Sequence, residues 1–285
     1  MGRRGWLGLG LATAALLVAA VLLLPTIMVR LHPPDVREPG EWRFTHRLEP
    51  VAEMTVTRRI LTPDHEFTIV RSDADVAQCT IELSRGTVEA TRTTAEESKQ
   101  VTGQSVRIHG WSGRYVDPPS RDPFVTWEYA AGARATVTCT RQVISTATLL
   151  AVAEAVRFED TRIQLPFTLG TLPEGYRIYS LDEDTGSGTD VVSLSVQPVD
   201  RASLPSVVVR HGGGGSAYRC LGESDPGTGA SRAGRVCLST RWSAEDAPGA
   251  QAVVQQSLDR VAERIELASD PTDPTTWFDA ITLPR

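Results

Sequence analysis

The run from His211 to Gly215 is the stretch of the sequence that comes nearest to catalytic machinery. A histidine followed by glycines matches the oxyanion-hole motif of esterases, in which glycine N–H groups bind a developing oxyanion. That mechanism also requires a nucleophile elbow of the form G-x-S-x-G, and the sequence contains no such motif. We therefore interpret the run as a hairpin tip and assign no catalytic residue. An esterase-like hydrolase is kept only as the third alternative for the function.

Three aspartates, Asp182, Asp184 and Asp190, surround Gly186 and Gly188 in a short polar segment. Carboxylates two residues apart around glycine can converge on a hard cation such as Ca²⁺. The full calcium-loop pattern, with a glutamate at its twelfth position, is missing. The aspartates are thus a weak calcium candidate, and an acidic hairpin tip is the simpler interpretation. The sequence predicts no other metal site and no cofactor.

The four cysteines are Cys79, Cys139, Cys220 and Cys237. In an oxidising compartment an even number of cysteines indicates disulfides, and four cysteines allow three pairings. We favour Cys79 with Cys139 and Cys220 with Cys237, because each pair then stays within one copy of the repeat described below. Buried thiols are the alternative. A zinc site is disfavoured, since the spacings are wide and no C-x-x-C motif occurs.

Residues 6–29 form an apolar run without a charged residue, and Arg3 and Arg4 come before it. A helix of this length would cross a hydrocarbon core of about 30 Å, and the two arginines would hold the N-terminus in the cytoplasm. A cleaved signal peptide is the alternative. We predict a cytoplasmic tail at residues 1–5, a transmembrane helix at 6–29 and a proline-rich stalk at 30–52. The protein would then be a single-pass cell-membrane protein with its remaining chain outside.

The chain beyond the predicted membrane segment is acidic. Without Arg3 and Arg4 it has 27 basic residues against 35 acidic ones, a net charge of −8. Nucleic acids and anionic lipid surfaces bind basic stripes. We therefore expect no nucleic-acid partner.

A motif near the middle of the chain returns near its end. The stretches 148–173 and 257–284 align through VAEAVRF with VAERIEL and through TLP with TLP. A repeat of this length is typical of a duplicated domain rather than of a solenoid. The residues that carry it are Leu149, Val152, Val156 and Phe167 in the first copy, and Leu258, Val261, Ile265 and Phe278 in the second.

Each copy begins with the alternation of strands and ends with the periodicity of a helix. Phe67 and Ile69 alternate with polar residues after a turn at Pro63, which predicts one strand of a hairpin. The helical stretches, begun by a cap at Ser145 or Thr146 in the first copy, each have one apolar face. The predicted fold class is α+β: an N-terminal transmembrane helix, then two similar domains at 53–173 and 174–285. Each domain would be a mainly antiparallel sheet covered by one C-terminal helix.

The repeated motif also carries a family resemblance. VTWEY (125–129) precedes LLAVAEAVRF (149–158), and LPF (165–167) and LPEG (172–175) follow. This order resembles uncharacterised extracytoplasmic domains of GC-rich Gram-positive bacteria. Such domains occur in membrane-anchored lipoproteins and as the outer parts of some anti-sigma factors. The resemblance implies a tandem duplication of such a domain, and it brings no catalytic residues with it. The chain lacks the cytoplasmic domain of an anti-sigma factor, so the resemblance does not extend to direct transcriptional control.

These observations predict a membrane-anchored, extracytoplasmic binding or sensory module without catalytic activity. Its partners would be the membrane, through residues 6–29, and a protein or a small ligand of the cell envelope. The second hypothesis is a carrier of lipids or other amphiphiles, or an envelope-maintenance factor, because a curved sheet closed by a helix can hold an acyl chain in its concavity.

Overall fold

The structure is a computed structural model of the 285-residue chain. It describes residues 36–38, 41–51, 53–72, 77–85, 103–140, 144–186, 191–199, 204–212, 219–221, 235–241 and 249–284. The predicted tail at 1–5 and the predicted transmembrane segment at 6–29 lie outside the described residues.

The described residues are mainly β-strands, with two α-helices among them. The first half contains β1 (Phe44–Leu48), β2 (Met54–Leu61), β3 (His65–Ser72), β4 (Gln78–Arg85), β5 (Gln104–Ile108), β6 (Trp111–Val116), β7 (Phe124–Ala130), β8 (Ala133–Cys139), α3 (Thr146–Ala155) and β9 (Val156–Thr161). The second half contains β10 (Gln164–Leu165), β11 (Phe167–Leu169), β12 (Tyr176–Asp184), β13 (Val191–Pro198), β14 (Ser206–His211), β15 (Arg219–Cys220), β16 (Val236–Arg241), α4 (Ala250–Ala262), β17 (Ile265–Leu267) and β18 (Phe278–Asp279).

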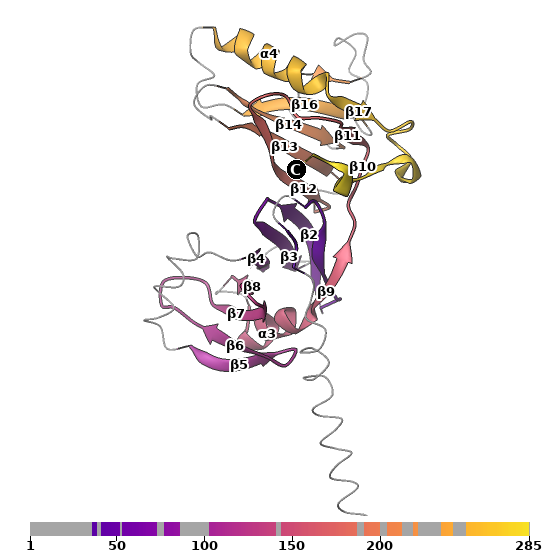
Figure 1. The fold of residues 1–285 in the computed structure, drawn as a ribbon. Coiled ribbons are helices and arrows are strands. Elements are labelled where there is room, and N and C mark those ends of the chain that lie inside the picture. The colour runs from indigo at the N-terminus through magenta and orange to yellow at the C-terminus, as the bar shows by residue number, and fades with distance from the viewer. Residues whose placement is uncertain are drawn as a thin grey trace, which may run out of the picture.

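One antiparallel sheet of twelve strands runs through both halves, in the order β15-β16-β14-β13-β12-β2-β3-β4-β8-β7-β6-β5. The halves join where β12 pairs with β2, and Figure 1 shows these two strands side by side at the junction. The predicted α+β class with two separate sheet-and-helix domains is therefore wrong. The described chain is mostly β. It has one main sheet and not two, because the edge strands of the two halves pair with each other.

The strand order of the first half recurs in the second. The order β2-β3-β4-β8-β7 corresponds to β12-β13-β14-β16-β15, and a helix follows β8 and β16 in the chain. The strand after each helix then pairs with a strand that precedes the sheet of its own half, β9 with β1 and β17 with β11. Strand β1 falls within residues 30–52, so this part of the predicted stalk is folded, and Phe44 is fully buried.

The two helices are short. Helix α3 has 10 residues and begins at the predicted cap, where the hydroxyl of Ser145 accepts a hydrogen bond from the Thr148 N–H. Helix α4 has 13 residues. No helix within the described ranges is long and apolar enough to cross a membrane. The described residues therefore supply no membrane-spanning helix for the predicted single-pass cell-membrane location, and the predicted helix at 6–29 is not among them.

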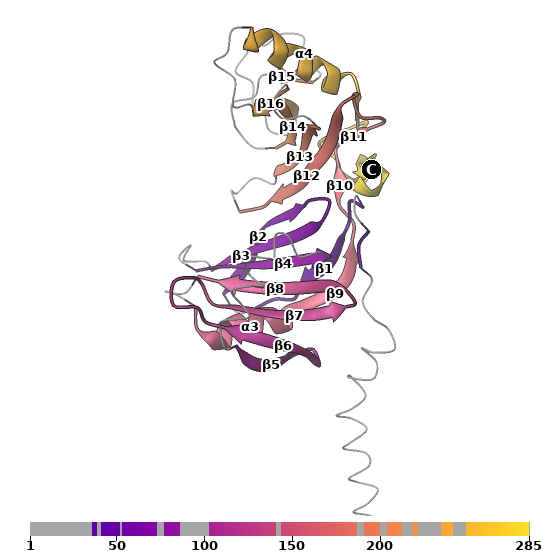
Figure 2. The ribbon, with the colours of Figure 1, turned by 60° about the vertical axis from the view of Figure 1, so that its left-hand side comes forward.

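The sheet has a buried inner face and a more open outer face. A row of cross-strand neighbours on six successive strands is buried and marks the inner face: Leu194, Leu181, Leu61, Glu66, Leu83 and Ala135. Helices α3 and α4 contact this face in their respective halves, and Figure 2 shows them at opposite ends of the molecule. The inner face therefore holds two apolar cores in one sheet.

Candidate binding surface

The outer face of the sheet has a hollow where the two halves meet, which we call the junction hollow. Its volume is about 440 Å³, within the range of about 300 to 1,000 Å³ of small-molecule sites. Side chains from β2, β3 and β4 line one side, and side chains from β12, β13 and β14 line the other. The hollow is therefore formed only when the two halves are joined.

Strand β3 turns its apolar alternate residues toward this hollow. Phe67 and Ile69 are half-buried and line it, whereas Glu66 and Thr68 between them are buried on the inner face. Ile60 on β2 is the cross-strand neighbour of Phe67 and adds to the same patch. The hollow thus has an apolar patch, Ile60, Phe67 and Ile69, on its first-half side.

The second-half side of the hollow is rich in hydroxyl groups. Ser180 on β12 pairs in register with Ser195 on β13, and Ser193 pairs with Arg210 on β14. These side chains are half-buried, and all four line the hollow. Hydroxyl groups donate and accept hydrogen bonds, and a guanidinium binds anionic or strongly polar oxygens. An apolar patch beside a hydroxyl-rich patch suits an amphipathic ligand.

A bidentate ion pair crosses the junction within the lining of the hollow. The Arg58 guanidinium on β2 donates to both carboxylate oxygens of Asp182 on β12, with Nε 2.9 Å from Oδ1. The hydrogen bond to Asp182 raises the pKa of Arg58. This geometry orients both side chains and helps hold the two halves in register.

The calcium candidate is not assembled in the described residues. Asp182 is bound to Arg58, Asp184 accepts a hydrogen bond from the Gly186 N–H, and both lie in strand β12. Asp190 lies outside the described residues. In the part of the chain that is described, no group of three or more metal-ligating side chains could hold a metal ion.

On the inner face, opposite the junction hollow, lies a group of polar residues that we call the polar seam: the buried Arg37, Thr45, His46, Glu66 and Thr68, and the half-buried Arg59. Glu66 is its centre. Its carboxylate accepts from the Thr45 N–H at 2.9 Å and from the Thr45 hydroxyl at 2.8 Å, and it lies 3.3 Å from the Arg37 Nε. Because β1 supplies Thr45 and β3 supplies Glu66, the seam fixes β1 against the main sheet.

Arg59 ties the seam to the second half. Its guanidinium donates to the His46 carbonyl at 3.1 Å, lies 3.7 Å from the centroid of the Phe44 ring, and pairs with Glu183 of β12 at 3.6 Å. Burial raises the pKa of Glu183, although Arg59 opposes the shift. On this face the seam lies between the two cores. Leu61 on β2 belongs to the second-half core, and Val70 on β3 belongs to the first-half core.

Glu66, His46 and Thr68 have the order of a hydrolase triad. Glu66 Oε2 lies 3.0 Å from His46 Nδ1, and His46 Nε2 lies 2.9 Å from the Thr68 hydroxyl. The Thr68 residue is only 2% exposed and His46 is fully buried, so a substrate has no access to the hydroxyl. The chain of contacts therefore orients β1 and β3.

The pKa of Glu66 gives the seam a pH signature. Burial alone would raise this pKa, but hydrogen bonds from His46 and Thr45 outweigh burial and hold it below the ordinary value of 4.5. A carboxylate with a depressed folded-state pKa stabilises the fold above its unfolded-state pKa, and this stabilisation is lost as the pH falls through the folded-state pKa. We expect unfolding free energy to fall as the pH drops from about 4.5, with a shallower fall in Glu66→Gln. Urea unfolding at several pH values measures both curves; parallel curves would contradict the assignment.

No family model matches the sequence, and no curated protein matches it. Among solved structures the chain is similar to MucB, at 12% identity and a TM-score of 0.21. The match covers 75% of this chain and 92% of the MucB chain. A TM-score of this size supports no statement about fold or function. The resemblance to extracytoplasmic domains of Gram-positive bacteria stays a prediction.

The esterase-like motif lies in the second-half core region. His211 is 7% exposed on β14, and its ring meets Trp277 edge to face at 5.2 Å. Gly212 has a positive φ of 76°, and residues 213–215 lie outside the described ranges. The described part of the motif is therefore a strand end with a packed histidine.

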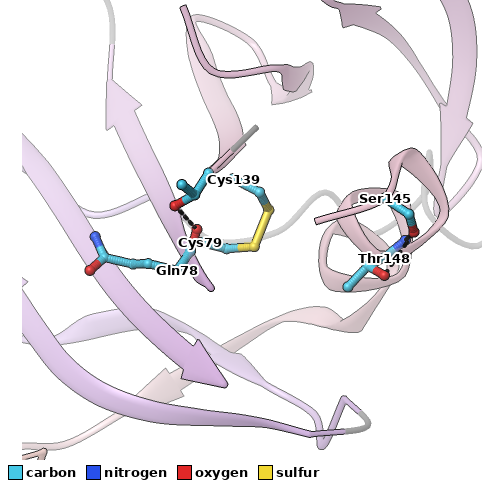
Figure 3. Close-up of a disulfide and its surroundings, with 6 residues drawn as sticks. Gln78, Cys79, Cys139, Ser145 and Thr148 are labelled. Carbon is cyan, nitrogen blue, oxygen red and sulfur yellow. Dashed lines mark hydrogen bonds between the residues drawn. A yellow bond between two sulfur atoms is a disulfide. The ribbon is translucent and has the colours of Figure 1, made fainter. Parts of the chain in front are cut away.

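Both favoured disulfides are present. Cys79 and Cys139 face each other on β4 and β8, and Cys220 faces Cys237 on β15 and β16. Figure 3 shows the first bridge. Beside it, the Thr140 hydroxyl donates a hydrogen bond to the Gln78 carbonyl at 3.1 Å. No cysteine is free.

The repeated motif residues are structural. Leu149, Val152 and Val156 belong to the first-half core, and Phe167, Leu258 and Val261 belong to the second-half core. Ile265 packs partly buried against that second core, and Phe278 is half-buried in β18, opposite Leu165. None of these residues lines the junction hollow.

Proposed function

We propose that the protein is a non-catalytic binding module that holds a small amphipathic ligand in the junction hollow. The observation that carries this proposal is the division of the hollow into an apolar patch on β2 and β3 and a hydroxyl-rich patch on β12, β13 and β14. The apolar part of the ligand rests on Phe67 and Ile69. Its polar head meets Ser193, Ser195 and Arg210.

Two further observations support a binding role. The triad-like chain through His46 is buried on the opposite face of the sheet, where it orients strands. The two disulfides are of the kind found in proteins that fold in an oxidising compartment. A ligand-dependent signal fits this site, because the ligand would contact both halves across the β2–β12 junction.

The site can be tested with octyl glucoside below its micellar concentration, since this probe joins an apolar chain to a hydroxyl-rich head. We expect the full-length protein to bind octyl glucoside and to bind glucose far more weakly in isothermal titration calorimetry. In Phe67→Ser/Ile69→Ser the Kd should rise at least tenfold, because burying each apolar side chain contributes about 1 to 2 kcal/mol.

Ile281→Ser is the matched control, because Ile281 is 56% exposed and lies outside the hollow. This variant should bind the probe as the parent protein does. Equal loss of binding in the control and in the hollow variant, with both folded, would count against the junction hollow as the site.

The amphiphile carrier is the second candidate, and the same apolar patch favours it. The sequence predicts that the acyl chain of such a ligand lies in the concavity between the sheet and a helix. This location is disfavoured, because buried core side chains fill the inner face. An acyl chain would instead lie along Ile60, Phe67 and Ile69. A carrier must also release its ligand, so transfer of a fluorescent fatty acid from the protein to neutral vesicles distinguishes a carrier from a sensor.

A further inference from the structure

A second hollow lies at the far end of the sheet, over β5, β6, β7 and β8, and we call it the arginine hollow. Its volume is about 1110 Å³, and it shares no lining residue with the junction hollow. Arg107, Arg114 and Arg134 line it from three different strands, and Glu128 is the carboxylate that lines it with them. It is a locally cationic surface on a chain with a net charge of −6.

The three arginines are available to a partner. All three residues are exposed. Among the described residues, none of them forms an ion pair. Arg107 pairs in register with Ser112, and Arg114 pairs with Ser105, so hydroxyl groups lie beside the guanidinium groups. Guanidinium groups on neighbouring strands of a sheet face can bind the carboxylates of an acidic strand that is added at its edge.

Strand β5 is also an edge of the twelve-stranded sheet. It joins β6 through the two-residue turn His109-Gly110, where φ is positive at both positions, 49° and 84°. Such a turn is flanked by a hydrogen-bonded pair, here Ile108 with Trp111. Hydrogen-bonded and non-hydrogen-bonded pairs alternate along an antiparallel ladder. The N–H and C=O groups of Ser105 and Arg107 therefore point away from β6.

An open edge of this kind accepts a further strand, since in the described part of the chain no strand pairs with the outer side of β5. The side chains of Ser105 and Arg107 lie on the arginine-hollow side of the same strand. A polypeptide bound to the edge would present its alternate side chains to Arg107 and, one strand further in, to Arg114. Arg134 lies three strands from the edge, about 14 Å away at the usual strand spacing.

We infer that β5 and the arginine hollow bind an acidic, extended segment of a protein partner, which joins the sheet as an additional strand. Its backbone pairs with Ser105 and Arg107, and its carboxylates contact Arg107 and Arg114. Both features point to a peptide: the open edge recognises a backbone, and the arginines recognise acidic side chains. This site is separate from the ligand site proposed in the junction hollow.

The test uses a fluorescein-labelled peptide of alternating Glu and Val, titrated with full-length protein in fluorescence anisotropy. We expect saturable binding that weakens with salt, and at least tenfold weaker binding of a Lys/Val peptide. Arg107→Gln/Arg114→Gln should raise the Kd for the acidic peptide at least tenfold, and Arg134→Gln should raise it less. Arg177→Gln, an exposed arginine on β12, is the matched charge control and should leave the Kd unchanged.

The backbone contribution is tested by Ser105→Pro, which removes an outward N–H and leaves the β5–β6 ladder intact. We expect at least tenfold weaker binding than in Ser105→Ala, which keeps that N–H. A peptide N-methylated on the alternate residues of its pairing edge tests the same contact on the unaltered protein, and should also bind at least tenfold more weakly.

Equal affinity for the N-methylated and unmodified peptides would overturn strand addition, as would equal affinity for the Glu/Val and Lys/Val peptides. Tight binding of heparin that is unchanged in Ser105→Pro would show a general polyanion surface and would also overturn the proposal. Phe67→Ser/Ile69→Ser should bind the peptide normally, so failure of this inference and failure of the junction-hollow proposal are distinguishable.

Discussion

Glu66→Ala should lower the free energy of unfolding by about 3 to 5 kcal/mol. The side chains of Arg37 and Glu66 are 5% and 4% exposed, and that of His46 is fully buried. Removing the carboxylate leaves the guanidinium buried without its ion-pair partner and removes both hydrogen bonds from Thr45. Urea unfolding followed by tryptophan fluorescence measures the loss, because Trp42 is part of the neighbouring core.

The matched control is Glu82→Ala, which breaks the pair between His65 on β3 and Glu82 on β4, on the outer face of the sheet. These side chains are 26% and 38% exposed, so solvent screens the pair and the expected cost is below about 1 kcal/mol. Equal costs for the two variants would mean that the polar seam contributes no more than a surface pair.

Replacing both Cys79 and Cys139 by alanine should destabilise the first half by about 4 kcal/mol. The bridge closes a chain segment with a sequence separation of 60 residues, and the loop-entropy relation gives this magnitude. The second bridge has a separation of 17, for which the same relation gives about 3 kcal/mol. Thermal unfolding of the two double variants measures both effects.

The Cys79→Ala/Cys139→Ala variant should also lose packing, because Cys79 and Cys139 are buried within the first-half core. Cysteine-to-serine variants at the same positions provide a second comparison, and they should cost at least as much. A change below about 1 kcal/mol on removing the Cys79–Cys139 bridge would contradict a stabilising role.

Local features of the fold could be predicted from the sequence. The cap at Ser145 and the apolar spacing of Leu149 and Val152 predicted a helix in the position of α3, because both signals lie within a few residues. The disulfide pairing was favoured because each pair stays within one copy of the duplicated unit, and the structure has this pairing. The helix signals depend on neighbours in the chain, whereas the pairing required only the division of the chain into two copies.

The continuous sheet could not be predicted in this way. Strand β2 pairs with β12, which places Leu61 opposite Leu181, two residues that are 120 positions apart. The repeat suggested two self-contained units. The sequence of neither unit contains a pattern that indicates pairing between their edge strands. The predicted fold class, with a separate sheet in each domain, was therefore wrong, although each half has its own core.

The candidate site was missed for a related reason. The alternation in β3 gave an apolar face with Phe67 and Ile69, but this face lines the outer hollow, and the polar alternates Glu66 and Thr68 are buried. The inner face accepts them because β1 supplies His46 and Thr45 as partners. No spacing along the chain indicates that pairing.

Native mass spectrometry tests the central claim, a ligand site on the outer face at the junction, most directly. The full-length protein would be purified without detergent from the cells that naturally make it, in parallel with Phe67→Ser/Ile69→Ser and Ile281→Ser. We predict that the parent protein and Ile281→Ser carry the same additional small-molecule mass, and that Phe67→Ser/Ile69→Ser has lost it. An additional mass retained in full by the folded Phe67→Ser/Ile69→Ser variant would contradict the account.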